Sequence, residues 1–178
     1  MENQKKGHSR EENIKLHNKR NCLFCQPDFE KNESYRNLKV LNSNSCFAIL
    51  DRNPKSLGHS LVICKTPFDD LTNIISDVEE REKMKTLEAA IDLATRLEKV
   101  LGAEKTYIML MCEKWHLWET SSCITTEHFH FHLVPRYPGM RNTREAAEKL
   151  LAKDGERKEQ ATLEKIAQMI NSSFYQRT

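Results

Sequence analysis

The sequence predicts a single domain of mixed class, in which a β-sheet and helices share one core. Three observations support this prediction. Short apolar segments of strand length, bounded by turn residues, occur between residues 35 and 64 and again between 106 and 134. An apolar stripe at helical spacing runs from Met84 to Leu101. The length of 178 residues is typical of one domain with a single core.

The composition narrows the classes of protein to which the chain can belong. Hydrophobic residues make up 38% of the chain and charged residues 30%, and no apolar run is long enough to span a bilayer. The net charge of +2 is too small to favour nucleic acid as a bulk partner. Residues 1–21 are polar and lack the apolar segment of a secretory signal, so we expect a loose N-terminal arm and a cytoplasmic protein.

The first half of the chain contains three predicted strands. Residues 35–50 are expected to form two short strands around a turn at Asn42 to Ser45. The stretch from Asp51 to Gly58 contains Pro, Gly and polar residues and is predicted to be a loop. The third strand, His59 to Cys64, is expected to end before Pro67.

A long helix is predicted to begin near Asp77 and to end at Gly102, because glycine is typical of the position after a helix. Its apolar stripe favours packing against the sheet, and part of the stripe also suits a subunit interface. The stripe consists of Met84, Leu87, Ile91, Ala94, Leu97 and Leu101. Residues 106–112 form the next predicted strand.

Two further helical stripes follow Gly139. The first consists of Ala146, Ala147, Leu150 and Leu151, and the second of Leu163, Ile166, Ala167 and Ile170. Neither shows a catalytic pattern. Residues 141–178 are therefore predicted to be a C-terminal helical extension packed on the domain.

The most informative stretch is His128-Phe129-His130-Phe131-His132-Leu133-Val134-Pro135. Alternate side chains of a strand point to opposite faces, so the three histidines are expected to share one face and the apolar residues the other. The strand is expected to end at Pro135, which cannot donate to a sheet. A polar strand face, a metal site and nucleophilic catalysis by a histidine are all compatible with this pattern.

Cys22 and Cys25 form a CxxC motif, whose two thiolates can bind one zinc ion. A structural zinc site normally needs four ligands, and the sequence contains no second CxxC. The remaining cysteines are Cys46, Cys64, Cys112 and Cys123. Without a secretory signal, free thiols or a metal site are favoured over disulfides.

The alternation of His128, His130 and His132 with apolar residues resembles the signature of the histidine triad (HIT) superfamily. The segment from Phe47 to Pro54, followed by Gly58 to Lys65, looks like the upstream block of that family. The ending Pro135-Arg136 is similar to the bacterial Hit and fragile-histidine-type hydrolases. The resemblance covers roughly Cys22 to Arg136, and we expect a HIT-like domain over residues 22–140.

The resemblance implies an α+β fold with a meander-like antiparallel sheet and one long helix. It also implies a nucleotide hydrolase or nucleotidyl transferase that cleaves at the α-phosphate and requires no cofactor for catalysis. Dinucleoside polyphosphates, phosphoramidates and adenylylated adducts are the expected substrate classes, with a purine nucleotide as the partner. Family members commonly form homodimers.

The resemblance also assigns roles by position. His130 is the expected nucleophile, which forms a nucleotidyl-histidine. His132 and His59 are expected to hold phosphate oxygens. His128 is expected to fix the tautomer of His130 through its backbone carbonyl. The assignment agrees with the chemistry, because a phosphoryl centre needs positioned donors and a nucleophile more than a strong base.

Nucleotide contacts are expected from four further residues. Asp51 would accept hydrogen bonds from the ribose, and Phe47 and Leu50 lie near the base-binding strand together with Ile49. Which of these three face the base is open at this point. Before the triad, where the family has Gly-Gln-Ser or Gly-Gln-Thr, this chain has Cys123-Ile124-Thr125, in which Thr125 keeps a hydroxyl. This departure leaves a catalytically weak nucleotide-binding module as the alternative function.

Zinc-bearing relatives use the CxxC pair, the first triad histidine and a histidine at the position of Pro67. The resemblance therefore implies a structural zinc ion bound by Cys22, Cys25 and His128. Its fourth ligand is open, with His116, Cys112 and Cys123 as candidates. A metalloprotein that uses all three triad histidines as ligands remains a third interpretation.

Overall fold

The structure, a computed structural model, describes residues 22–25, 32–68, 77–110, 128–140 and 160–173. Its centre is a five-stranded antiparallel sheet in the order β1-β2-β3-β5-β4. The strands are β1 (Lys39–Asn42), β2 (Cys46–Leu50), β3 (Ser60–Cys64), β4 (Lys105–Leu110) and β5 (His130–Arg136). The predicted α+β class and antiparallel sheet are confirmed. β1 to β3 form a meander, and β5 lies between β3 and β4.

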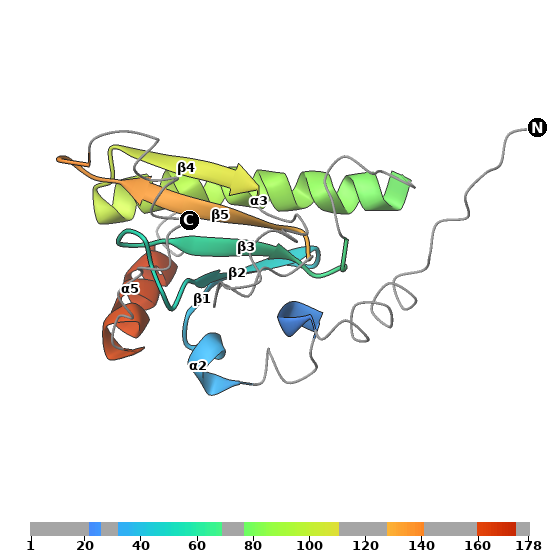
Figure 1. Ribbon diagram of the computed structural model, residues 1–178, viewed down its shortest axis with the longest axis horizontal. Coiled ribbons are helices and arrows are strands. Elements are labelled where there is room, and N and C mark those ends of the chain that lie inside the picture. Colours follow the sequence, from blue (N-terminus) through green and yellow to red (C-terminus); the bar gives the residue numbers. More distant parts are fainter. Residues whose placement is uncertain (1–21, 26–31, 69–76, 111–127, 141–159, 174–178) are drawn as a thin grey trace, which may run out of the picture.

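Among the residues that the structure describes, four helical segments accompany the sheet (Figure 1). They are the 3₁₀ turn η1 (Leu23–Cys25), α2 (Glu33–Arg36), the long α3 (Asp77–Leu101) and α5 (Gln160–Ser172). α3 runs along the sheet and contacts β3, β4 and β5, while α5 contacts β1 and α3. The long helix has its predicted ends, and Gly102 follows it with a φ of 69°. No helix in these described ranges is long and apolar enough to span a membrane.

Two of the differences between the predicted and the observed strand boundaries have a local physical cause. Tyr35 lies in α2 rather than in a strand, because Asn32 accepts the Ser34 amide N–H and starts a short helix. Pro135 does not end β5, which continues to Arg136. Pairing between β3 and β5 ends at Leu133, so Pro135 lies beyond the region where β3 needs a donor.

The buried face of α3 also differs from the prediction. Met84 and Ile91 are about half exposed, although Ala94 and Leu97 are buried as expected. The buried residues of the helix are Lys83, Thr86, Ala90, Leu93, Ala94 and Leu97. Lys83 is accommodated by an ion pair with Glu79 at 2.7 Å and by the ring of Phe68, 5.3 Å from its ammonium.

The two faces of the sheet have different chemistry. The face toward α3 contributes Ala48, Leu50, Val62, Phe131 and Leu133 to the main core. That core also contains the α5 stripe Leu163, Ile166, Ala167 and Ile170, so the second C-terminal helix is confirmed. The opposite face combines histidines with a smaller apolar cluster of Phe47, Ile49 and Ile63. Function is therefore expected on this second face.

Candidate active site

β5 presents His130 and His132 on the sheet face opposite α3. Register with β3 pairs His130 with Ile63 and His132 with Leu61, and His59 directly precedes β3. Residues at alternate positions share a face, so His59 lies on the same side as the two triad histidines. His59 and His130 are buried, and His132 is half-buried.

The backbone fixes the tautomer of His130. Its Nδ1 lies 2.6 Å from the carbonyl oxygen of His128, which can only accept, so Nδ1 must donate. The lone pair of the neutral ring is therefore on Nε2. This is the arrangement that a nucleophilic imidazole requires.

Hydrogen bonds connect His130 to two further imidazoles. His130 Nε2 is 3.1 Å from His132 Nε2, and His132 Nδ1 is 3.0 Å from His59 Nε2. Since His130 Nε2 has no proton, His132 Nε2 donates to it, and His59 Nε2 then donates to His132 Nδ1. His59 Nδ1 accepts the backbone N–H of Lys55 at 3.3 Å, which completes a consistent set of neutral tautomers.

Burial keeps these imidazoles neutral. Desolvation lowers the pKa of His130 to about 4, although its bond to the His128 carbonyl acts in the opposite direction. Desolvation likewise lowers the pKa of His132 well below its usual value, and the nearby His130 lowers it further. The pKa of His59 is also lowered by desolvation, against the raising effect of Asp51. The three rings are thus donors and acceptors at neutral pH without carrying charge.

Asp51 lies beside His59. Its Oδ2 is 3.5 Å from His59 Nδ1, and its Oδ1 accepts the backbone N–H of Asn53 at 2.8 Å. The second bond forms a local turn that fixes the carboxylate at the start of the loop. Among the residues predicted to bind nucleotide, the structure therefore brings Asp51 to the histidines.

An apolar cluster lies next to the histidines on the same face. Phe47, Ile49 and Ile63 form its buried part, and Phe24, Tyr35 and Leu61 pack against it. The ring centroid of Phe24 is 5.6 Å from that of His128 and 5.5 Å from that of His130, both with edge geometry. Phe24 was not among the predicted site residues, whereas Ile49 was one of the three residues expected near the base-binding strand.

Leu50 does not join this cluster. It is 1% exposed and lies in the main core beneath α3, on the opposite face from Phe47. Phe47 and Leu50 are three positions apart in β2, so the alternation of a strand places them on different faces. The same alternation indicates Ile49 as the neighbour of Phe47.

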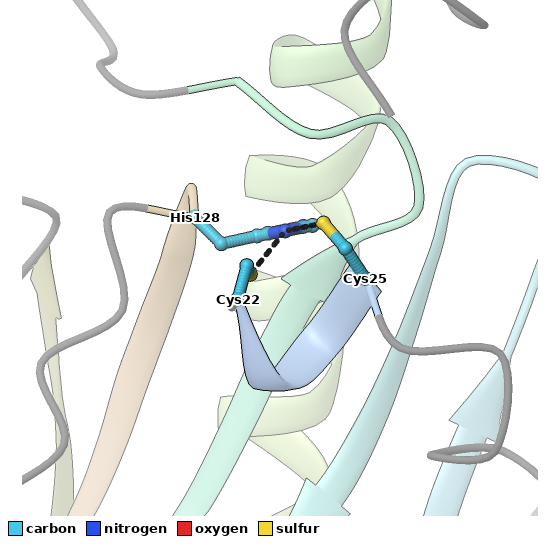
Figure 2. A group of neighbouring side chains, drawn as sticks. All are labelled: Cys22, Cys25 and His128. Atoms are coloured by element: carbon cyan, nitrogen blue, oxygen red, sulfur yellow. Dashed lines mark hydrogen bonds between the residues drawn. The ribbon is translucent and has the colours of Figure 1, made fainter. Parts of the chain in front are cut away.

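Cys22, Cys25 and His128 converge on one point (Figure 2). His128 Nδ1 is 3.6 Å from Cys22 Sγ and 3.2 Å from Cys25 Sγ. The other ring nitrogen, Nε2, is 2.6 Å from the carbonyl oxygen of Cys64 and must donate to it. Nδ1 therefore directs its lone pair at the two sulfurs, which fits a zinc site whose histidine is held by a backbone carbonyl.

The three triad histidines do not surround one common point. Within the described ranges, the side chains that could bind a metal form two separate groups. His128 lies with the two cysteines, and His132 lies with Asp51 and His59. The second group is already joined by its own hydrogen bonds. This geometry favours separate roles for His128 and His132 over one three-histidine metal site.

Several predicted residues lie outside the described residues. These are Thr125, which was expected to contact nucleotide, and the candidate fourth zinc ligands Cys112, His116 and Cys123. Pro67, at the position of the fourth ligand in zinc-bearing relatives, is described and buried. A proline has no metal-binding side chain, so this position supplies no ligand.

Comparison with known proteins relates this site to a family. The model of the HIT domain family matches residues 32–139. An uncharacterised HIT-like protein of Borreliella burgdorferi is 28% identical over 117 residues, which are 65% of this chain and 76% of that protein.

Two solved structures share the fold. A zinc-bound histidine triad family protein of Mycobacterium smegmatis has a TM-score of 0.54 and 22% identity, over 78% of this chain and 84% of that chain. The diadenosine triphosphate hydrolase of Plasmodium falciparum, in complex with Cyclomarin A, has a TM-score of 0.55 and 14% identity, over 80% and 79% of the respective chains.

Proposed function

This chain belongs to the HIT domain family, and on that premise we propose that it is a nucleotide hydrolase or nucleotidyl transferase. It cleaves a nucleoside phosphate adduct at the α-phosphate through a nucleotidyl-histidine on His130. The observation that supports the proposal most strongly is the 2.6 Å contact from His130 Nδ1 to the His128 carbonyl oxygen, which puts the lone pair on Nε2. The fold shared with the Plasmodium falciparum hydrolase agrees with this activity.

In the first step, the lone pair of His130 Nε2 forms a bond to the α-phosphorus. The bond between phosphorus and the leaving group breaks, and its electron pair departs with that group, which takes up a proton from solvent where its basicity requires one. Substrate phosphate must first take the N–H of His132 away from His130 Nε2, and the N–H of His59 away from His132 Nδ1. That N–H and the N–H of His59 then hold the phosphate oxygens, which gain negative charge.

In the second step, water attacks the same phosphorus. The P–N bond breaks, its electron pair returns to His130 Nε2, and the nucleoside monophosphate leaves after the water loses a proton to solvent. The same neutral tautomer of His130 is restored by the His128 carbonyl. A covalent nucleophile usually accelerates a reaction because it replaces one difficult displacement by two easier ones.

The nucleoside is held beside this centre. Asp51 accepts hydrogen bonds from the ribose hydroxyls, and the apolar cluster of Phe47, Ile49 and Ile63 takes a purine base. Flat aromatic and aliphatic surfaces suit a base because they bury it without unpaired polar groups. Thr125 keeps its proposed contact to the nucleotide.

Cys22, Cys25 and His128 are proposed to bind a structural zinc ion, which would tie η1 to the start of β5. The unprotonated Nδ1 of His128, which faces the two cysteine sulfurs, supports this ligand set. Catalysis needs no metal in this scheme. A homodimer, a cytoplasmic location and the division at residues 22 and 140 remain part of the proposal.

The test is incubation with diadenosine polyphosphates and with an adenosine phosphoramidate, followed by chromatography of the products. Wild type should release AMP, and His130→Ala should lower the rate by at least about a thousandfold, because no nucleophile remains. His17→Ala is the control, since this histidine has no proposed role. AMP release that is unchanged in His130→Ala would contradict the mechanism.

The same assay distinguishes the proposed enzyme from the alternative function, a nucleotide-binding module. Tight nucleotide binding with no turnover of any substrate would support a nucleotide-binding module. Chelator treatment during the assay tests the remaining interpretation, because loss of activity only on chelation would indicate a catalytic metal.

A further inference from the structure

The C-terminal helix α5 is hydrogen-bonded to α2, although α5 lies outside the residues that match the family model. Gln160 Nε2 donates to the Ser34 carbonyl oxygen at 3.1 Å and to Glu164 Oε1 at 3.0 Å. The same Glu164 oxygen accepts from Asn37 Nδ2 at 3.1 Å. α5 therefore contacts both α2 itself and the residue that ends it.

α2 depends on such contacts for its orientation. It has four residues, none of them buried, and an isolated helix of this length is not stable in water. Its Asn32 cap satisfies one local donor but does not fix the helix relative to the sheet. The chain joins α2 to β1 through Asn37 and Leu38, and the bonds from Gln160 and Glu164 add a second attachment, to α5.

α5 is itself firmly placed. Four of its residues, Leu163, Ile166, Ala167 and Ile170, belong to the main core. At its other end, Asn171 Nδ2 donates to the Lys39 carbonyl oxygen of β1 at 3.0 Å. Bonds from such a helix restrain α2, because the helix cannot move without disturbing the core.

α2 places Tyr35 at the candidate active site. Tyr35 is half-buried and packs against the cluster of Phe47, Ile49 and Ile63. The guanidinium carbon of Arg52 lies 5.4 Å from the centroid of the Tyr35 ring. Arg52 directly follows Asp51, so Tyr35 borders both the apolar cluster and the loop that begins at the proposed ribose ligand.

Electrostatics agree with a persistent α5–α2 contact. Hydrogen bonds from Gln160 and then Asn37 lower the pKa of Glu164, against a smaller opposing effect of desolvation. The ionised group accepts both bonds, and bonds to a charged acceptor are stronger than those between neutral groups.

We propose that α5 positions Tyr35 against the apolar cluster, so that Gln160 and Glu164 are positioning residues for nucleotide affinity that act through Tyr35. The inference rests on the proposed function, since it takes the cluster as the base-binding surface. It makes the C-terminal extension a part of the nucleotide site, without contact between α5 and the nucleotide.

The experiment measures the dissociation constant of AMP by calorimetric titration, which does not depend on turnover. The double variant Gln160→Ala/Glu164→Ala is compared with Tyr35→Ala and with the triple variant. We expect each to weaken AMP binding about threefold to tenfold, and the triple variant to bind no more weakly than Tyr35→Ala, because effects through one residue are not additive. Tyr35→Phe keeps the ring and should bind AMP more tightly than Tyr35→Ala does.

Ser172→Ala is the matched control. It removes one hydrogen bond within α5, to the Gln168 carbonyl oxygen at 2.8 Å, at the end of the helix away from Gln160. It should leave AMP affinity unchanged. Thermal unfolding of every variant confirms that the compared proteins are folded. In the double variant the loss should appear in KM and not in kcat, because the hydrogen bonds of His130 stay in place.

Three results would overturn the inference. The double variant could bind AMP as wild type does, or its effect could add fully to that of Tyr35→Ala, or kcat could fall while affinity is unchanged. Each of these leaves the proposed function intact. Failure of wild type itself to bind AMP would instead remove the proposed function, together with this inference.

Discussion

His128 contributes its backbone to one site and its side chain to another. Its carbonyl oxygen accepts from His130 Nδ1 at 2.6 Å, while its Nδ1 faces Cys25 Sγ at 3.2 Å. A substitution of the side chain therefore removes a proposed zinc ligand but keeps the acceptor that orients His130. The two proposed functions of this residue can be separated experimentally.

Zinc binding should depend on the thiols. Cys25→Ser and His128→Ala should each lower the zinc content of the purified protein well below that of wild type, because a site with so few ligands tolerates no loss. Zinc is measured by atomic absorption after gel filtration. Cys46→Ala is the control, since this buried cysteine lies in the main core on the other face of the sheet. Equal zinc content in all variants would contradict the ligand set.

The pH dependence should follow the neutral imidazoles. The pKa of His130 is lowered from 6.5 to about 4, so the proposed nucleophile is unprotonated at neutral pH and kcat/KM should fall only as the pH approaches about 4. For stability, the unfolded chain binds more protons than the folded chain between these values. The free energy of unfolding should therefore have its full value above pH 6.5 and decrease as the pH falls from 6.5 to about 4.

Urea unfolding at a series of pH values measures this effect. His130→Gln removes one titrating group and should flatten the decrease relative to wild type, although the lowered pKa values of His59 and His132 leave part of it. A stability that rises as the pH falls from 6.5 would contradict the lowered pKa values.

Much of the fold follows from local patterns. Alternation in the histidine stretch predicted that His130 and His132 share a face, and the stripe from Leu163 to Ile170 predicted a packed helix. Local patterns did not predict that β5 lies between β3 and β4, because strand order depends on contacts between distant parts of the chain. The Cys64 carbonyl that holds the His128 ring is a contact of the same kind.

Two errors have simple physical causes. Hydrophobicity alone placed Met84 and Ile91 on the buried face of α3, where they are not, although Ala94 and Leu97 are buried as predicted. That face instead includes Lys83, which is paired with Glu79. Leu50 was grouped with Phe47 by proximity in sequence, although three positions along a strand reverse the face. Both errors concern the direction in which a side chain points. An ion-pair partner decides it for Lys83, and the alternation of the strand decides it for Leu50.

A pair of adjacent substitutions in β2 tests the assignment of the two faces. Leu50→Ala should lower the free energy of unfolding by about 2–5 kcal/mol, because it leaves a cavity in the main core, and should leave AMP affinity unchanged. Ile49→Ala should weaken AMP binding, because it removes part of the apolar cluster. Urea unfolding and calorimetric titration give the two quantities. If AMP binding were weaker in Leu50→Ala but unchanged in Ile49→Ala, the base would contact the sheet face toward α3.

The last prediction concerns Gly58, which connects the loop after Asp51 to His59. Its φ is +81°, and an added Cβ would clash with Cδ1 of Leu101 in α3. Gly58→Ala should lower the free energy of unfolding by about 1–2 kcal/mol from backbone strain, and by more if Leu101 cannot move. It should also lower turnover, since it displaces the imidazole that holds His132.

Gly102→Ala is the matched control for Gly58→Ala. Gly102 has a similar φ of +69°, but an added Cβ there meets no atom within 4 Å. It should show the backbone strain alone and keep full turnover. The difference in unfolding free energy between the two variants, measured in urea, isolates the contact with Leu101. Equal stability combined with equal turnover would show that neither Leu101 nor His59 is sensitive to the position of residue 58, and would contradict a rigid attachment of His59 to α3.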